Sequence, residues 1–132
     1  MKTLIVLIED DEDDQMLFKD AMAEIVGEVE CMVYGDGDVA LSKLPELDTL
    51  PKVVFLDLNL PKVHGLECLK LLKQHPKLRN LPVVIFSTSN NPEDEKSGIE
   101  LGAHLFIKKQ GEYKLYKNEI ARGIDAFDLL KK

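Results

Sequence analysis

The sequence predicts an α/β fold: a doubly wound, parallel five-stranded sheet with helices on both faces. Short apolar runs rich in β-branched residues alternate with longer segments whose apolar residues recur at helical spacing. Three of the runs are continuously apolar, as strands covered on both faces are. Five alternations of strand and helix favour right-handed crossovers between parallel strands. The expected strands span residues 3–8, 29–34, 53–58, 82–87 and 104–109.

The composition fits one compact domain. The chain has 132 residues, enough for a single core, and 45 % of them are hydrophobic, as in globular proteins. No linker or composition shift divides the chain, so we expect a single domain over residues 1–132 with no second, output domain. The net charge of −7 argues against nucleic-acid phosphates as partners and leaves a metal cation as a candidate ligand.

The location follows from two absences in the sequence. The longest apolar runs fall far short of the roughly 20 residues that span a bilayer, and the start "MKTLIVLIEDD" turns acidic too soon for a signal peptide. Cys31 and Cys68 are isolated, which favours buried thiols over a disulfide or a metal site. We therefore expect a cytoplasmic protein that does not bind membranes.

The first strand runs directly into six consecutive acidic residues, 9–14. A helix is expected next, over residues 13–26, with Asp13 or Asp14 at its N-terminus and Gly27 as its stop. Its apolar side chains at helical spacing are Met16, Leu17, Phe18, Ala21 and Ile25.

Four further helices are expected between and after the remaining strands. The spacing of Leu66, Leu69 and either Leu71 or Leu72 predicts an inward face for the third helix. Asn91 is placed to cap the fourth helix, and Gly102 to close it. These helices span residues 36–44 (ended by Pro45), 65–74 (followed by Pro76), 92–101 and 112–130.

Polar side chains stand at the carboxyl ends of four predicted strands, the edge where open α/β sheets bind ligands. Strand one ends in Glu9 and Asp10, and strand three ends at Asp57. Strand four ends in the hydroxyl run 87–89, and strand five in the lysine pair 108–109. The topology therefore gathers carboxylates, hydroxyls and an ammonium on one rim.

This set of groups points to a divalent cation and a phosphoryl group. Carboxylates at close range repel one another unless a cation compensates. A hard ion such as Mg²⁺ takes one or two carboxylates together with water and phosphate oxygens. A carboxylate such as Asp57 can also act as a nucleophile and form an aspartyl-phosphate. Ser87 and a lysine would then bind the phosphoryl oxygens.

Simpler roles account for other polar residues. Residues 11–14 suit the start of a helix, where acidic side chains interact favourably with the helix dipole. His64, His75 and His104 lie on unrelated elements, and we assign them no chemistry.

Taken in order, four strings resemble the receiver domain of two-component response regulators: "VLIEDDEDD", "VVFLDLNLPKVHGLE", "LPVVIFSTSN" and "GAHLFIKK". The resemblance covers nearly the whole chain, from Leu4 to about Leu130. It implies the flavodoxin-like strand order 2-1-3-4-5. It also implies a signalling protein rather than an enzyme, whose only reactions are self-phosphorylation from small donors and self-dephosphorylation.

The resemblance also assigns roles to residues. Asp57 would be the phosphoacceptor, and Ser87 and Lys109 would bind the phosphoryl group. Ser87 and Phe106 would be the switch residues. Asn59 and Ser89 occupy positions that tune hydrolysis. The metal, Mg²⁺ or alternatively Mn²⁺, would be held by Glu9, Asp10, Asp57 and the backbone carbonyl of Asn59.

The implied partners are a sensor histidine kinase or phosphotransfer protein and an unknown downstream protein, and a homodimer is left open. Phosphorylation would alter the face formed by helix four, strand five and helix five. The acidic start and the loop "LPELDTLPK" resemble small regulators associated with phytochrome-type kinases.

Two positions depart from the family pattern. Gln110 stands where the lysine is usually followed by a proline in a cis peptide, so the Lys109–Gln110 bond is either cis at a cost of roughly 3 kcal/mol or trans in a different loop. Lys108 is therefore an alternative to Lys109. The switch position is Phe106 rather than the commoner tyrosine.

Other functions remain as alternatives. A haloacid dehalogenase-type phosphatase also uses a strand-end aspartate and Mg²⁺, but it needs a second aspartate where this chain has Asn59. A degenerate receiver would bind partners without phosphorylation. A flavodoxin-like FMN protein lacks support, because no phosphate-binding Gly/Ser/Thr loop follows the first strand.

Overall fold

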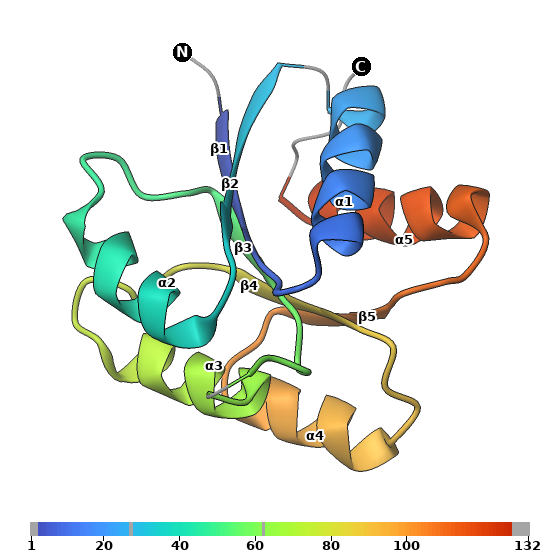
Figure 1. Cartoon of the computed structure of the whole chain (residues 1–132). Coiled ribbons are helices and arrows are strands. Elements are labelled where there is room, and N and C mark those ends of the chain that lie inside the picture. The colour runs from blue at the N-terminus through green and yellow to red at the C-terminus, as the bar shows by residue number, and fades with distance from the viewer. Residues whose placement is uncertain (1–2, 27, 62, 128–132) are drawn as a thin grey trace.

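A computed structural model describes residues 3–26, 28–61 and 63–127 and confirms the predicted fold class (Figure 1). All strand pairs of the five-stranded sheet are parallel, in the order β2-β1-β3-β4-β5. The strands are β1 (Thr3–Ile8), β2 (Val29–Tyr34), β3 (Val53–Leu56), β4 (Val83–Ser87) and β5 (Leu105–Lys108).

The helices cover both faces of the sheet. α1 and α5 lie on one face, and α2, α3 and α4 lie on the other (Figure 1). Within the described part of the chain, no helix has both the length and the apolar character needed to cross a membrane. The helices are α1 (Glu12–Ile25), α2 (Gly37–Lys43), the 3-10 helix η1 (Leu44–Glu46), α3 (Gly65–Gln74), α4 (Pro92–Glu100) and α5 (Tyr113–Asp125).

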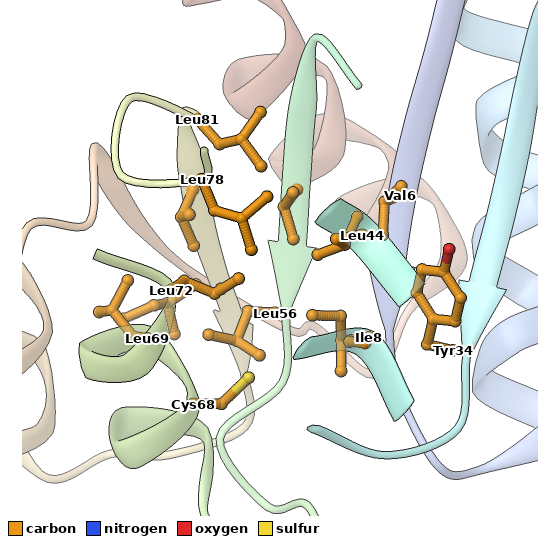
Figure 2. Close-up of a cluster of buried hydrophobic side chains, with 14 of the residues drawn as sticks. Val6, Ile8, Tyr34, Leu44, Leu56, Cys68, Leu69, Leu72, Leu78 and Leu81 are labelled. Atoms are coloured by element: carbon orange, nitrogen blue, oxygen red, sulfur yellow. The ribbon is translucent and has the colours of Figure 1, made fainter. Parts of the chain in front are cut away.

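Two apolar cores flank the sheet because successive strand residues point to opposite faces. In β1, Ile5 and Leu7 pack on the α1 and α5 side, whereas Val6 and Ile8 pack on the α2 and α3 side. Figure 2 shows the second core, where side chains of the α3 segment meet those of β1 and β3. Its labelled members are Val6, Ile8, Tyr34, Leu44, Leu56, Cys68, Leu69, Leu72, Leu78 and Leu81.

The start of α1 differs from the prediction. Asp11, not Asp13 or Asp14, is the N-cap, and its carboxylate accepts a hydrogen bond from the backbone N–H of Asp14 at 3.0 Å. In the helix that begins at this cap, Phe18 and Ala21 are buried while Met16 is 65 % exposed. The predicted stop at Gly27 lies outside the described residues.

The other helix ends agree with those predicted from the sequence or differ from them by a few residues. Asn91 caps α4 through the N–H of Glu93, and Gly102 follows its C-terminus with a φ of 109°, as predicted. Pro45 does not end α2 directly, because it lies inside η1, which continues from that helix. α5 ends at Asp125, short of the predicted residue 130; residues 128–130 lie outside the described part.

The inward face of α3 and the two thiols follow the sequence closely. Leu69 and Leu72 are buried, so Leu72 rather than Leu71 faces the core. Cys68 is buried and Cys31 is half-buried, and both are free thiols.

Candidate functional site

Three carboxylates meet at the carboxyl edge of two neighbouring inner strands, β1 and β3. Glu9 and Asp10 directly follow β1, and Asp57 directly follows β3. One oxygen from each of the three lies within 4.8 Å of the others. Because β1 and β3 are hydrogen-bonded neighbours, their parallel register brings together residues that lie far apart in the chain. The strand-end argument from the sequence is therefore correct for these three side chains.

The chain holds Asp57 in an almost dry position. Its backbone N–H donates to the carbonyl of Ile8 at 3.1 Å, and the residue is only 5 % exposed. Its Oδ1 is buried and has no hydrogen-bond partner in the described structure. An unpaired buried carboxylate oxygen is costly, so Oδ1 is an acceptor available to a ligand.

Lys109 supplies the cation at this edge. Its ammonium donates to Glu9 Oε1 and to Asp14 Oδ2, the latter at 3.3 Å. It lies 3.8 Å from Asp57 Oδ2. The described peptide bonds are all trans, so Lys109–Gln110 is trans. Lys108 is exposed on the rim, and the structure thus brings Lys109 rather than Lys108 into the cluster.

Burial and charge shift the pKa values of this pair. Burial raises the pKa of Glu9 to about 7, and the charge of Asp57 adds to the shift, while Lys109 opposes it. Burial alone would lower the pKa of Lys109, but its hydrogen bond to Glu9 and the charges of Asp57, Glu9 and Asp14 raise it. The ammonium is therefore firmly charged, and the acidic edge still carries more negative than positive charge.

Glu9 and Asp10 have different surroundings. Glu9 is 2 % exposed, and both of its carboxylate oxygens have partners: Lys109 at Oε1 and the backbone N–H of Asp11 at Oε2, the latter at 3.3 Å. Asp10 is exposed. Gln15, which the sequence did not single out, donates its amide to the carbonyl of Glu9 at 2.7 Å and holds this turn in place.

The hydroxyl residues after β4 form a connected loop. Ser87 is fully buried, and its Oγ accepts from the backbone N–H of Ser89 at 3.2 Å. The Ser89 hydroxyl donates to Asp94 Oδ2 at 2.5 Å and accepts from the N–H of Asn91 at 3.2 Å. Ser89 therefore connects the end of β4 to the first turn of α4, a link that the sequence did not predict.

The remaining predicted residues surround the carboxylates less closely. Asn59 is exposed in the loop after Asp57. Phe106 is half-buried on β5 and packs against the core on the α3 face. His64 has a structural role, since its Nδ1 accepts from the N–H of Leu66 at the start of α3.

Gly65 is a site-shaping residue that the sequence did not reveal. Its N–H donates to the carbonyl of Leu58 at 2.9 Å, which fastens the start of α3 to the loop carrying Asp57. A Cβ at this position would collide with the carbonyl oxygen of Asp57 and with Leu58 Cα. The missing side chain lets the two backbones approach this closely.

Comparison with known proteins places this geometry in a family. The model of the response regulator receiver domain matches residues 5–120. Response regulator Rcp1 of Synechocystis sp. is 33 % identical over 130 residues, which is 94 % of this chain and 87 % of Rcp1. The chain belongs to the response regulator receiver family. It is thus a two-component signalling protein, and the resemblance seen in the sequence is confirmed.

Solved structures extend the likeness to phytochrome response regulators. The phosphorylated cyanobacterial phytochrome response regulator RcpA shares 31 % identity and a TM-score of 0.87, with both chains fully covered. The bacteriophytochrome response regulator AtBRR shares 32 % identity and a TM-score of 0.81, over 100 % of this chain and 96 % of that one. These similarities agree with the subfamily expected from the sequence.

One further structure holds a metal. The Mn(2+)-bound form of Rcp1 shares 31 % identity and a TM-score of 0.83, over 96 % of this receiver and 94 % of that chain. Likeness to enzymes is partial: a protein-glutamate methylesterase of Trichodesmium erythraeum matches over only 22 % of its length. The family assignment is therefore to signalling receivers and not to the enzymes that contain a receiver as one part.

Proposed function

We propose that this receiver accepts a phosphoryl group on Asp57 from a histidine kinase or phosphotransfer protein, in a reaction that needs Mg²⁺. The observation that carries the proposal is the buried, unpartnered Oδ1 of Asp57, on a carboxylate that lies beside those of Asp10 and Glu9. A buried nucleophile with an open oxygen, next to an acidic cluster, suits phosphoryl transfer.

The donor set fits a hard divalent cation. Asp10 and Asp57 would bind it directly, together with the backbone carbonyl of Asn59. Both oxygens of Glu9 already have partners, so Glu9 would act from further out. The cation, Mg²⁺ or alternatively Mn²⁺, would neutralise charge on the phosphoryl oxygens.

The transfer itself needs few groups. One carboxylate oxygen of Asp57 bonds to phosphorus, the P–N bond of a phosphohistidine breaks, and its electron pair returns to the imidazole nitrogen. Lys109 and the Ser87 hydroxyl would bind the phosphoryl oxygens. Asn59 and Ser89 flank the site and would tune hydrolysis, although the contacts of Ser89 with α4 hold its hydroxyl in the loop.

Signalling would follow from the movement of Ser87. When its Oγ turns to the phosphoryl group, it must give up the N–H of Ser89, which is tied to α4 through Asp94. The half-buried Phe106 would repack at the same time. This shifts a two-state equilibrium at the face formed by α4, β5 and α5, where a downstream protein or a second copy would bind.

The setting of this function is also proposed. This receiver would act through protein contacts in the cytoplasm. The similarity to RcpA and AtBRR favours a phytochrome-type sensor kinase as the donor.

The test uses a small phosphodonor. The protein is incubated with acetyl phosphate and Mg²⁺, and its intact mass is measured. The expected result is the mass gain of one phosphoryl group in wild type and none in Asp57→Asn. If wild type gains nothing, the chain is a degenerate receiver that binds partners without phosphorylation. Equal gain in Asp57→Asn would place the acceptor on another residue.

The switch has its own readout. Light scattering with and without the donor reports whether phosphorylation changes the oligomeric state. Glu46→Gln removes one charge at an exposed residue of η1, far in the sequence from α4, β5 and α5. This control variant should respond to the donor as wild type does.

A further inference from the structure

We propose that Asp14 is a positioning residue that competes with the phosphoryl group on Asp57 for the Lys109 ammonium. Asp14 comes from the first turn of α1, a segment that the sequence assigned to the start of a helix and the rim of the site. This inference rests on the proposed function and names a residue that tunes it.

The ammonium of Lys109 lies among three carboxylates. It is hydrogen-bonded to Glu9 and to Asp14, but its 3.8 Å distance to Asp57 Oδ2 is too long for a hydrogen bond. Asp14 is held in place by its own backbone N–H, which donates to the Asp11 cap. The cap therefore orients a carboxylate that keeps Lys109 on the α1 side of the site.

The two hydrogen-bonded partners of Lys109 differ in how easily they can be given up. The Glu9 side chain is 2 % exposed, so losing the ammonium would leave its charge buried. The Asp14 side chain is 41 % exposed, and water can replace the ammonium there. Contact with Asp14 is thus the one that Lys109 can exchange for a phosphoryl oxygen.

The surrounding space permits this exchange. Asp14 and Lys109 both line a cavity of about 250 Å³ between α1 and the loop after β5. Leu17 and Tyr116 line the same cavity, which leaves room for water beside Asp14. An ammonium has three donors, and a phosphoryl group adds charged acceptors that outweigh one half-solvated carboxylate.

Removing the competing carboxylate should favour the phosphoryl-bound state. The probe is beryllofluoride, a phosphoryl mimic, titrated at saturating Mg²⁺ and followed by the ¹⁹F resonance of the bound form. Asp14→Asn should bind it roughly threefold more tightly than wild type, since partly exposed ion pairs are weak. Asp14→Glu, which keeps the carboxylate, should bind it like wild type.

Two controls separate positioning from a general loss of charge. Asp13→Asn removes the same charge from the same helical turn, at an exposed residue outside the cluster around Lys109, and should leave the affinity unchanged. The Mg²⁺ affinity, measured by thermal shift without beryllofluoride, should stay the same in Asp14→Asn. The proposal would be overturned if Asp13→Asn and Asp14→Asn gained equal affinity for beryllofluoride, or if Asp14→Asn bound it more weakly than wild type.

Failure here is distinct from failure of the proposed function. If wild type itself does not bind beryllofluoride while Mg²⁺ is present, the phosphoacceptor assignment falls. If wild type binds it and Asp14→Asn matches wild type, only the role of Asp14 falls.

Discussion

Glu9 and Lys109 form a buried ion pair although 100 positions separate them in the chain. Lys109 is the one cation paired with carboxylates at this edge within the described ranges, whereas Glu9 is one of several acids around it. The two partners are therefore not equivalent. Loss of the ammonium leaves several carboxylates facing one another, and loss of Glu9 leaves Lys109 with Asp14 and Asp57.

Lys109→Met should accordingly destabilise the metal-free protein more than Glu9→Gln does. We expect a loss of about 3 kcal/mol in the free energy of unfolding for Lys109→Met, because a buried charge is left uncompensated. Methionine keeps the unbranched side chain whose end lies over the Phe86 ring. Urea unfolding in the presence of EDTA measures both variants. Equal losses of unfolding free energy in the two variants would show that the Glu9–Lys109 ion pair, and not the excess of acidic side chains, determines the destabilisation.

Mg²⁺ should stabilise the folded protein. A ligand that binds only the folded state adds about 2.7 kcal/mol at a concentration one hundred times its Kd. Thermal unfolding should therefore shift upward with added Mg²⁺ in wild type and much less in Asp10→Asn. Glu12→Gln, an exposed change in the same acidic run, should respond like wild type. An undiminished shift in Asp10→Asn would remove Asp10 from the metal site.

Gly65→Ala should damage the site through the backbone. The new Cβ would press on the Asp57 carbonyl and on Leu58 Cα, neither of which can rotate away. Overpacking of this kind costs about 1–3 kcal/mol, and displacement of Asp57 should also slow phosphorylation by acetyl phosphate. Gly35→Ala, where a Cβ meets nothing within 4 Å, is the matched control. Normal stability and normal phosphorylation in Gly65→Ala would mean that α3 can move away from the Asp57 loop without a cost in free energy.

The two thiols should be unreactive in the folded protein. Burial raises the pKa of Cys31 to about 11 and that of Cys68 to about 12, from an ordinary value of 9.0. At pH 8 only about a thousandth of Cys31 would be thiolate, against about a tenth when unfolded. Ellman's reagent should therefore react slowly until guanidinium is added. Because the folded pKa values are raised, the stability they contribute is present below pH 9 and lost as the pH rises further.

Much of the fold could be predicted because the signals are local. Continuous β-branched runs mark the buried strands. Asn91 and Gly102 mark the ends of α4, because few residue types can accept a hydrogen bond at the N-cap or adopt a positive φ after the C-terminus. The start of α1 was harder, since several aspartates in the acidic run suit an N-cap and only the packing of Phe18 and Ala21 selects Asp11. Pro45 was misjudged because a proline can also begin a 3-10 helix.

The site was predictable to the extent that topology defines it. Parallel strands bring Glu9, Asp10, Asp57, Ser87 and Lys109 to one edge, and residue type suggests their chemistry. Contacts that depend on helix rotation or loop shape were not predictable. Asp14 reaches Lys109 only because the packing of α1 on the sheet sets the rotation of the helix, and Ser89 reaches Asp94 only through the turn before α4.

The position of β1 has a consequence for synthesis. This strand is made before the other four strands of the sheet, yet it lies inside the sheet between β2 and β3, with Ile5 beside Val53. A growing chain therefore carries its acidic turn long before Lys109 is made. Until then the carboxylates of this turn stay in water, and the sheet closes around β1 only when the later strands have emerged.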